Sequence, residues 1–125
     1  VGQAFGLHPM IAAKSSRENF ERLEEILLSR PDFFVGECGL DKRFEGYEPN
    51  GIQEQIFERQ ARLAKELNRP LQIHCVGDYS RIMEILSRAG YTPQAPQVIF
   101  HRFGADISVV KSAPIPSGKN PQRKR

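Results

Sequence analysis

The feature that most constrains the fold of this chain is a regular alternation of short apolar runs and amphipathic stretches. The runs are compact and rich in Val, Ile, Leu and Phe, which is typical of strands covered on both faces. Four strands are predicted, at residues 3–7, 33–36, 71–73 and 98–100. The stretches between them repeat apolar residues at helical spacing. Strands alternating with helices predict right-handed crossovers and therefore a parallel sheet.

Residues that favour helix ends support the helices that this order requires. Residues 15–18 read Ser-Ser-Arg-Glu, the spacing of a capping box before the first long helix. Pro31 and Pro70 are expected to end the first and second helices. Asp78 is expected to cap the third helix, and a further short helix is expected to start near Ala105.

The pattern predicts one α/β domain over residues 1–112, with about four consecutive strand–helix units. A doubly wound open sheet and a partial (β/α)8 TIM-type barrel both satisfy it. No Gly-rich phosphate-binding loop follows any of the strands, so the usual marker of a nucleotide-binding sheet is missing. Residues 113–125 are rich in Pro, Gly and basic residues without an apolar face, and are expected to be an irregular tail.

Composition narrows the class of protein further. The formal charge of +3 arises from the tail, because Lys119, Arg123, Lys124 and Arg125 are four of the 18 basic residues. The rest of the chain has 14 basic against 15 acidic residues, which weakens an interpretation as a purely electrostatic nucleic-acid binder. No apolar run approaches the ~18 residues of a membrane span, so no membrane partner is expected. The only two cysteines predict no disulfide framework, and a cytoplasmic location is expected.

Polar side chains that can bind a metal ion follow the predicted strands. His8, Glu37, His74 and His101 each stand at or just beyond the end of a strand. Carboxyl ends of parallel strands meet on one side of a sheet, where enzymes of this architecture place their sites. A single strand-end histidine is more often a structural residue, and Glu37 alone could be a solvated carboxylate. Four such residues together favour a divalent metal site.

The residue types also fit a particular chemistry. Carboxylate and imidazole ligands suit Zn, Mn, Fe or Ni better than Mg. A carboxylate can bridge two ions, and paired ions are a common clamp for phosphoester hydrolysis. Asp41, four residues after Glu37, could orient a ligand or a metal-bound water, or could simply form the turn before Lys42 and Arg43.

Five segments in the same order resemble one known family. Residues 35–41 (Val-Gly-Glu-Cys-Gly-Leu-Asp) closely resemble the Gly-Glu-x-Gly-Leu-Asp signature of the TatD-like metal-dependent deoxyribonucleases. Residues 4–9 resemble the Gly-x-His-Pro motif of that family, and residues 55–64 look like its following helix. Residues 70–75 and 98–103 resemble its next two strand ends. The resemblance covers residues 2–110.

Membership would imply a partial (β/α)8 TIM-type barrel of the metallo-dependent hydrolase superfamily. In the family, the residue matching Glu37 bridges two divalent ions, and those matching His74 and His101 bind one of them. The resemblance thus implies Glu37, His74 and His101 as metal ligands and Glu37, His8 and Asp41 as catalytic residues, with His8 contacting the substrate phosphate. The implied activity is hydrolysis of phosphodiesters in DNA, or of another phosphoester, with two Mg, Mn or Zn ions.

The sequence also departs from the family pattern. The initial His-x-His pair and the late Asp of the family are not in these 125 residues, and Val76 stands where many members carry Arg. The chain is therefore expected to be a truncated copy whose activity is impaired. Two alternatives are a non-catalytic half-barrel, which associates with a partner chain or with itself through exposed sheet edges, and a gene remnant without function.

Overall fold

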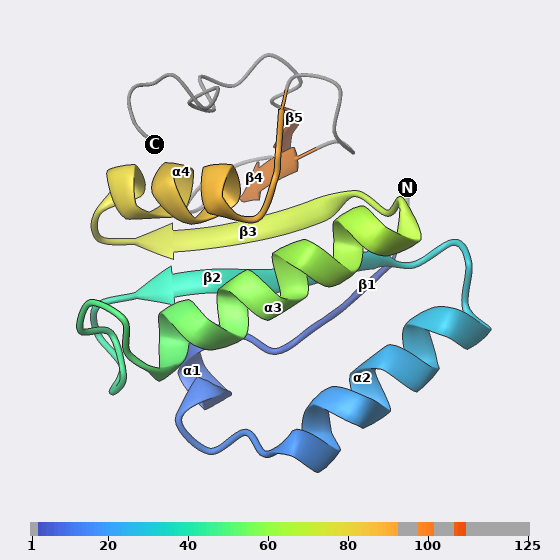
Figure 1. Ribbon diagram of the computed structural model, residues 1–125, viewed down its shortest axis with the longest axis horizontal. Coiled ribbons are helices and arrows are strands. Elements are labelled where there is room, and N and C mark those ends of the chain that lie inside the picture. The colour runs from blue at the N-terminus through green and yellow to red at the C-terminus, as the bar shows by residue number, and fades with distance from the viewer. Residues whose placement is uncertain (1–2, 93–97, 102–106, 110–125) are drawn as a thin grey trace.

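Four parallel strands with helices between them form the body of the chain in a computed structural model (Figure 1). The structure describes residues 3–92, 98–101 and 107–109, with the main chain alone at 101 and 107–109. In chain order the elements are β1 (Ala4–Phe5), α1 (Pro9–Ala12), α2 (Arg17–Ser29), β2 (Phe34–Asp41), α3 (Ile52–Leu67), β3 (Leu71–Val76), α4 (Tyr79–Arg88), β4 (Val98–His101) and β5 (Ile107–Val109).

The order of the strands decides between the two architectures that the sequence left open. The sheet runs β1-β2-β3-β4 in sequence order, and each of these neighbours is parallel. In a doubly wound sheet the chain returns after its first strands and adds the next strand beside the first one. In a barrel each new strand is added beside the strand before it. The predicted partial (β/α) barrel is therefore confirmed. In Figure 1 the arrowheads of β2 and β3 point to the same end of the sheet.

The helix boundaries follow local capping, with two departures from the sequence prediction. The cap of α2 is Ser16, one residue later than expected, because the side chain of Asn19 completes the capping box with the main chain of Ser16. Helix α3 ends at Leu67, since Asn68 takes a left-handed conformation with φ of 57° before Pro70 is reached. The cap of α4 by Asp78 is confirmed.

Strand β2 is longer than predicted and contains one extra residue. Val35 pairs with Leu71 and Cys38 with Ile73, so three steps along β2 match two along β3. Val35, Cys38 and Leu40 are buried beside Leu71 and Ile73, on the side that the helices cover. Because side chains alternate along a strand, the extra residue directs Glu37 to the opposite face.

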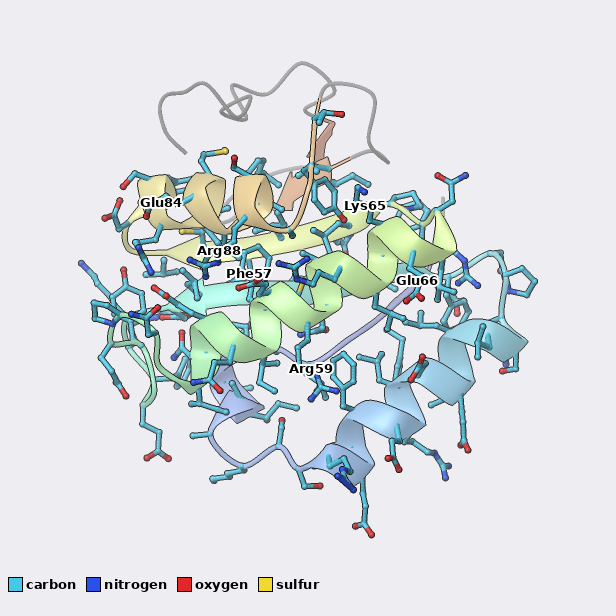
Figure 2. The ribbon with its side chains drawn as sticks, viewed as in Figure 1. Phe57, Arg59, Lys65, Glu66, Glu84 and Arg88 are labelled. Atoms are coloured by element: carbon cyan, nitrogen blue, oxygen red, sulfur yellow. The ribbon has the colours of Figure 1, made fainter. Side chains whose placement is uncertain are left out.

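The core lies between the sheet and helices α2, α3 and α4. Figure 1 shows α3 crossing in front of β2, and Figure 2 shows the labelled Phe57 within this layer. Arg59 extends from α3 to α2, where its guanidinium lies 3.9 Å from the centre of the Phe20 ring. The fully buried large side chains of this layer include Leu23, Leu27, Leu40, Phe57, Leu71, Ile73, Ile82, Ile85, Leu86 and Tyr91.

The last described element departs from the prediction of a helix near Ala105. Residues 107–109 form β5, which pairs antiparallel with β4. Residues 107–109 form a strand and not a helix because their main chain can pair with the edge of β4. The predicted tail, residues 113–125, lies outside the described residues. In the described part of the chain, no helix has the length and apolar character needed to cross a membrane.

Arg69 joins α2 to the segment that enters β3. The guanidinium of Arg69, which is 9% exposed, donates hydrogen bonds to the carbonyl oxygens of Leu27, Arg30 and Phe33 at 2.6, 3.1 and 3.2 Å. The carbonyl oxygens of Leu27 and Arg30 also accept main-chain hydrogen bonds, from Arg30 and Phe33. The Arg69 cation therefore adds a second, charged donor at the carboxyl end of α2, where a positive charge is favourable.

We expect Arg69→Met to lower the free energy of unfolding by about 2 to 3 kcal/mol, because buried carbonyl oxygens lose a charged donor. Urea denaturation would measure this change. The matched control is Arg22→Met, because Arg22 is exposed on α2. For this control a change in the free energy of unfolding within about 0.5 kcal/mol is expected. Equal effects of the two substitutions would contradict a capping role for Arg69.

Candidate active site

Four of the predicted site residues gather at the end of the sheet to which β2 and β3 point. His8 follows β1, Glu37 and Asp41 belong to β2, and His74 belongs to β3. The Oε1 atom of Glu37 lies 3.8 Å from Nε2 of His8 and 3.9 Å from Nδ1 of His74. The rings of His8 and His74 are 4.5 Å apart, centre to centre. Three of the four residues that the sequence placed near strand ends, His8, Glu37 and His74, therefore lie close together.

A glycine makes room for this cluster in the sheet. Gly39 lies between Glu37 and Asp41 on the same face of β2 and pairs with His74. Its φ of +145° suits glycine, and a Cβ atom there would collide with the carbonyl oxygen of His74. The sequence predicted that this strand ends at residue 36, with Glu37 at its end. That was wrong, because β2 continues to Asp41 and Gly36 and Gly39 allow its backbone to approach β3 closely.

Asp41 contacts both His74 of the cluster and Arg43. Its buried carboxylate accepts two hydrogen bonds from the Arg43 guanidinium, Nε to Oδ1 at 3.0 Å and Nη2 to Oδ2 at 2.8 Å. Oδ2 also lies 2.8 Å from Nε2 of His74. The hydrogen bonds from Arg43, and next that from His74, hold the pKa of Asp41 well below its usual range despite burial. Asp41 is therefore an anion at neutral pH.

An anionic Asp41 determines which nitrogen of His74 carries the proton. A carboxylate can only accept, so Nε2 of His74 must donate to Asp41. In the neutral ring this leaves the lone pair on Nδ1, the atom that faces Glu37. A carboxylate that orients a histidine in this way is a common partner of metal-binding imidazoles. The geometry fits both interpretations of Asp41, because Oδ1 of Asp41 also accepts a hydrogen bond from the main-chain N–H of Arg43 at 3.0 Å in the turn that follows.

His8 has the opposite arrangement. It caps the short helix α1, and its Nδ1 accepts a hydrogen bond from the main-chain N–H of Met10 at 3.0 Å. The proton of the neutral ring must then be on Nε2, which faces Glu37. Burial lowers the pKa of His8, and the neighbouring His74 lowers it further. Near neutral pH His8 is thus a neutral hydrogen-bond donor toward the cluster.

The cluster fits a metal ion through Glu37 and His74. One ligand atom from each of His8, Glu37 and His74 lies within 4.8 Å of the other two. Two ligands on one tetrahedral ion, with bonds of about 2.1 Å, stand about 3.4 Å apart, close to the 3.9 Å between Glu37 and Nδ1 of His74. His8 directs a proton rather than a lone pair inward. Cys75 keeps its proton, since burial raises its pKa to about 12.

The structure also brings in residues that the sequence analysis did not select. Arg43 was noted only as the residue after a turn, yet it forms the ion pair with Asp41. The fully buried Gln53 was not selected, and it binds the main chain of Asp41. An uncharged polar residue on the apolar face of a predicted helix was the signal available for Gln53. The side chain of His101, the third predicted ligand, lies outside the described residues.

The fold and this site define a class, the (β/α) barrels that carry functional residues toward the carboxyl ends of their strands. The family model described as TatD related DNase matches residues 1–114. The chain belongs to this family. The resemblance drawn from the sequence motifs is thereby confirmed.

Individual relatives agree with this family. The chain is 32% identical over 111 residues to the human 3'-5' RNA nuclease TATDN2, which covers 89% of the chain and 14% of that protein. It is 31% identical over 108 residues to YabD of Bacillus subtilis, described as an uncharacterized metal-dependent hydrolase, covering 86% of the chain and 41% of that protein. It is 31% identical over 98 residues to the 3'-5' ssDNA/RNA exonuclease TatD of Pantoea ananatis, and this match covers 78% of the chain and 36% of that protein.

A solved structure agrees as well. The chain matches YJJV, a TatD homologue from Escherichia coli, with a TM-score of 0.63 and 27% sequence identity. The match covers 73% of this chain and 39% of that chain. This chain thus spans between 14% and 41% of the length of these relatives.

We expect Asp41→Asn to lower the free energy of unfolding at pH 7 by about 1 to 3 kcal/mol, because a buried charged hydrogen bond is lost. The folded-state pKa of Asp41 is depressed, so its contribution is present above the unfolded pKa of about 3.9 and is lost as pH falls below it. Denaturant titrations from about pH 7 to about pH 2 should therefore show the wild type and the variant converging only below about pH 4, as pH falls toward the depressed folded-state pKa. A gap independent of pH would contradict this reading.

Proposed function

We propose that this chain contributes the core of a divalent-metal-dependent site that hydrolyses phosphodiester bonds in single-stranded nucleic acid. The observation that carries the proposal is the pairing of a lone pair on Nδ1 of His74 with the Glu37 carboxylate, while His8 directs an N–H to the same place. The names of the relatives support the substrate class, since they include a 3'-5' RNA nuclease and a 3'-5' ssDNA/RNA exonuclease.

Each residue has a distinct part in the proposal. Glu37 and His74 hold the ion, and His101 at the end of β4 supplies a further ligand. Asp41 orients His74 and keeps the proton on its Nε2 atom. His8 donates from Nε2 to a phosphate oxygen of the substrate, which a neutral imidazole with an occupied Nδ1 is suited to do.

A bound divalent ion would supply Lewis acidity at a phosphoryl oxygen. The ligand set of carboxylate and imidazole favours Mn or Zn, and Mg is the third candidate. The Glu37 carboxylate has two oxygens and can serve two ions. Impaired turnover by these 125 residues alone stays a prediction. A cytoplasmic location is also proposed, supported by Cys38 and Cys75, which are both free thiols.

We expect saturable Mn²⁺ binding that depends on His74 but not on His8. His74→Ala should weaken binding by more than about 100-fold, because even the outer partners of metal ligands are worth about 10- to 100-fold. His8→Ala should leave the affinity nearly unchanged, since its inward-facing nitrogen carries a proton. Isothermal titration calorimetry of the full-length protein would measure both.

The same variants test hydrolysis on a single-stranded oligonucleotide with a labelled 5' end. Both substitutions should reduce Mn²⁺-dependent shortening from the 3' end, His74→Ala through metal loss and His8→Ala at saturating metal. Hydrolysis that persists in chelator would contradict the proposal. An equal loss of Mn²⁺ affinity in the two variants would contradict the separate roles of the two histidines.

A second candidate, assembly with another chain or with a second copy, is favoured by the edge of the described sheet. β1 is an edge strand, and Phe5 in it is 38% exposed. Met10 and Ile11 in the adjacent helix α1 are 55% and 41% exposed. Unpaired strand edges and grouped apolar side chains promote association.

We expect sedimentation velocity to detect concentration-dependent association that Met10→Lys reduces. Leu28→Lys is the matched control, because Leu28 is 59% exposed on α2. A monomer at every concentration would exclude self-association. If His74→Ala and His8→Ala lose hydrolysis but associate as the wild type does, the enzymatic role is favoured over the assembly role.

A further inference from the structure

Two buried glutamines on α3, Gln53 and Gln60, lie outside the reaction proposed above. They are seven residues apart, about two helical turns, so both side chains leave the same face of the helix. Both are completely buried. A buried amide is costly unless its oxygen and its nitrogen are both hydrogen-bonded, so the partners of these two side chains define what they do.

Gln60 binds the segment that carries His8. Its Oε1 accepts a hydrogen bond from the main-chain N–H of Leu7 at 2.8 Å, and its Nε2 donates to the carbonyl oxygen of Leu7 at 3.0 Å. Leu7 immediately precedes His8 and lies beyond the end of β1. None of the strands in the described part of the chain pairs with Leu7, and the Gln60 amide binds both of its main-chain groups instead.

Gln53 binds the end of β2 in the same way. Its Oε1 accepts from the main-chain N–H of Asp41 at 2.8 Å, and its Nε2 donates to the carbonyl oxygen of Asp41 at 3.0 Å. The same Nε2 also lies 3.1 Å and 3.0 Å from the carbonyl oxygens of Phe44 and Glu45. One amide thus fixes both the residue that orients His74 and the turn that follows it.

The two contacts repeat one arrangement at two places that matter for the cluster. Each amide binds both main-chain groups of a single residue, Leu7 or Asp41. Leu7 is covalently joined to His8, and Asp41 is hydrogen-bonded to His74. Since both glutamines belong to one rigid helix, the distance between the two segments is set by α3.

We propose that Gln53 and Gln60 are positioning residues, which through α3 set the placement of His74 and His8 on either side of Glu37. The inference rests on the proposed metal-dependent function, because it assigns these residues to the geometry of that site. Binding geometry must be held to within about 0.5 Å to be productive. A segment that is hydrogen-bonded to a helix moves less than a loop without such bonds.

A purely structural role would also explain buried hydrogen bonds, so the test needs a matched contact elsewhere on the same helix. Tyr91 provides it. Its buried hydroxyl donates to the carbonyl oxygen of Ala61 at 2.8 Å, one residue from Gln60. Tyr91→Phe removes a buried hydrogen bond to α3 and touches neither of the segments that carry the cluster.

The test uses Gln53→Asn and Gln60→Asn in the full-length protein, with Tyr91→Phe as control. Asparagine keeps the amide but is one methylene too short to reach the same main-chain groups. In the metal-free protein, the ring ¹⁵N resonances of His74 should shift in Gln53→Asn and those of His8 in Gln60→Asn. Tyr91→Phe should shift neither, and a stability loss common to all three should not move them.

Metal affinity gives a second readout. Gln53→Asn should weaken Mn²⁺ binding by about 10- to 100-fold, as expected for an outer partner of a ligand, while Gln60→Asn and Tyr91→Phe should change it little. Unshifted ring resonances in either glutamine variant would overturn its assignment. If the wild type does not bind Mn²⁺, the proposed metal site fails, and the resonances still decide the positioning role.

Should an asparagine variant fail to fold, Gln53→Glu and Gln60→Glu replace it. Glutamate has the same length and keeps the acceptor for the main-chain N–H, but it loses the donor to the carbonyl oxygen. The histidine on the affected side should again be the one whose resonances shift. Identical spectra of these folded variants and the wild type would overturn the proposal.

Discussion

The one extra residue in β2 is the constraint on which the rest of the site depends. Without it, strict alternation would place either the apolar residues of β2 or its carboxylates on the wrong face. The shift between Val35 and Cys38 allows Cys38 and Leu40 to continue the core, while Glu37 and Asp41 share the other face. Core packing and site geometry are thus satisfied by a single irregularity in the strand pairing.

Two histidines of the same type acquire different chemistry from what binds their other nitrogen. The main-chain N–H of Met10 forces the proton of His8 inward, and the Asp41 carboxylate draws the proton of His74 outward. The sequence alone does not distinguish the two residues, since each is a histidine near a strand end. The distinction between a donor and a metal ligand arises only from the fold around them.

This explains how far the sequence alone could predict the molecule. Apolar periodicity predicted the alternation of strands and helices and the parallel sheet, because burial on both faces leaves a strong signal. It did not separate a barrel from a doubly wound sheet, and the barrel was expected only from the family resemblance. Strand-end position predicted that His8, Glu37 and His74 would meet. It could not predict the length of β2, since Gly36 and Gly39 are typical of turns and here serve close approach between strands.

Other features were hidden from the sequence for different reasons. The role of Asp41 stayed open between a turn former and an orienting carboxylate, because only the approach of β3 brings His74 to it. Gln53 and Arg69 act on main-chain groups, which have no sequence identity of their own. β5 is only three residues long and is defined by its antiparallel pairing with β4, which a run of three residues does not reveal in the sequence.

The loops at the site end of the sheet are fastened to one another before any ligand binds. The Tyr47 hydroxyl accepts a hydrogen bond from the main-chain N–H of Asp78, at 2.9 Å, and joins the loop after β2 to the loop after β3. Glu54 on α3 and Arg81 on α4 form a largely buried ion pair that spans the same two units. Arg81 lowers the pKa of Glu54, so this pair is charged at neutral pH.

These ties bear on how the cluster works. Glu37 and His74 come from neighbouring strands, so their separation varies only if β2 and β3 slide or their loops move. The hydrogen bond between Tyr47 and Asp78 and the ion pair between Glu54 and Arg81 oppose movement of the loops and helices. The pairing of β2 with β3 opposes sliding of the strands. A site held in this way loses little conformational entropy when an ion or a phosphate binds, because its ordering is part of the folding of the chain.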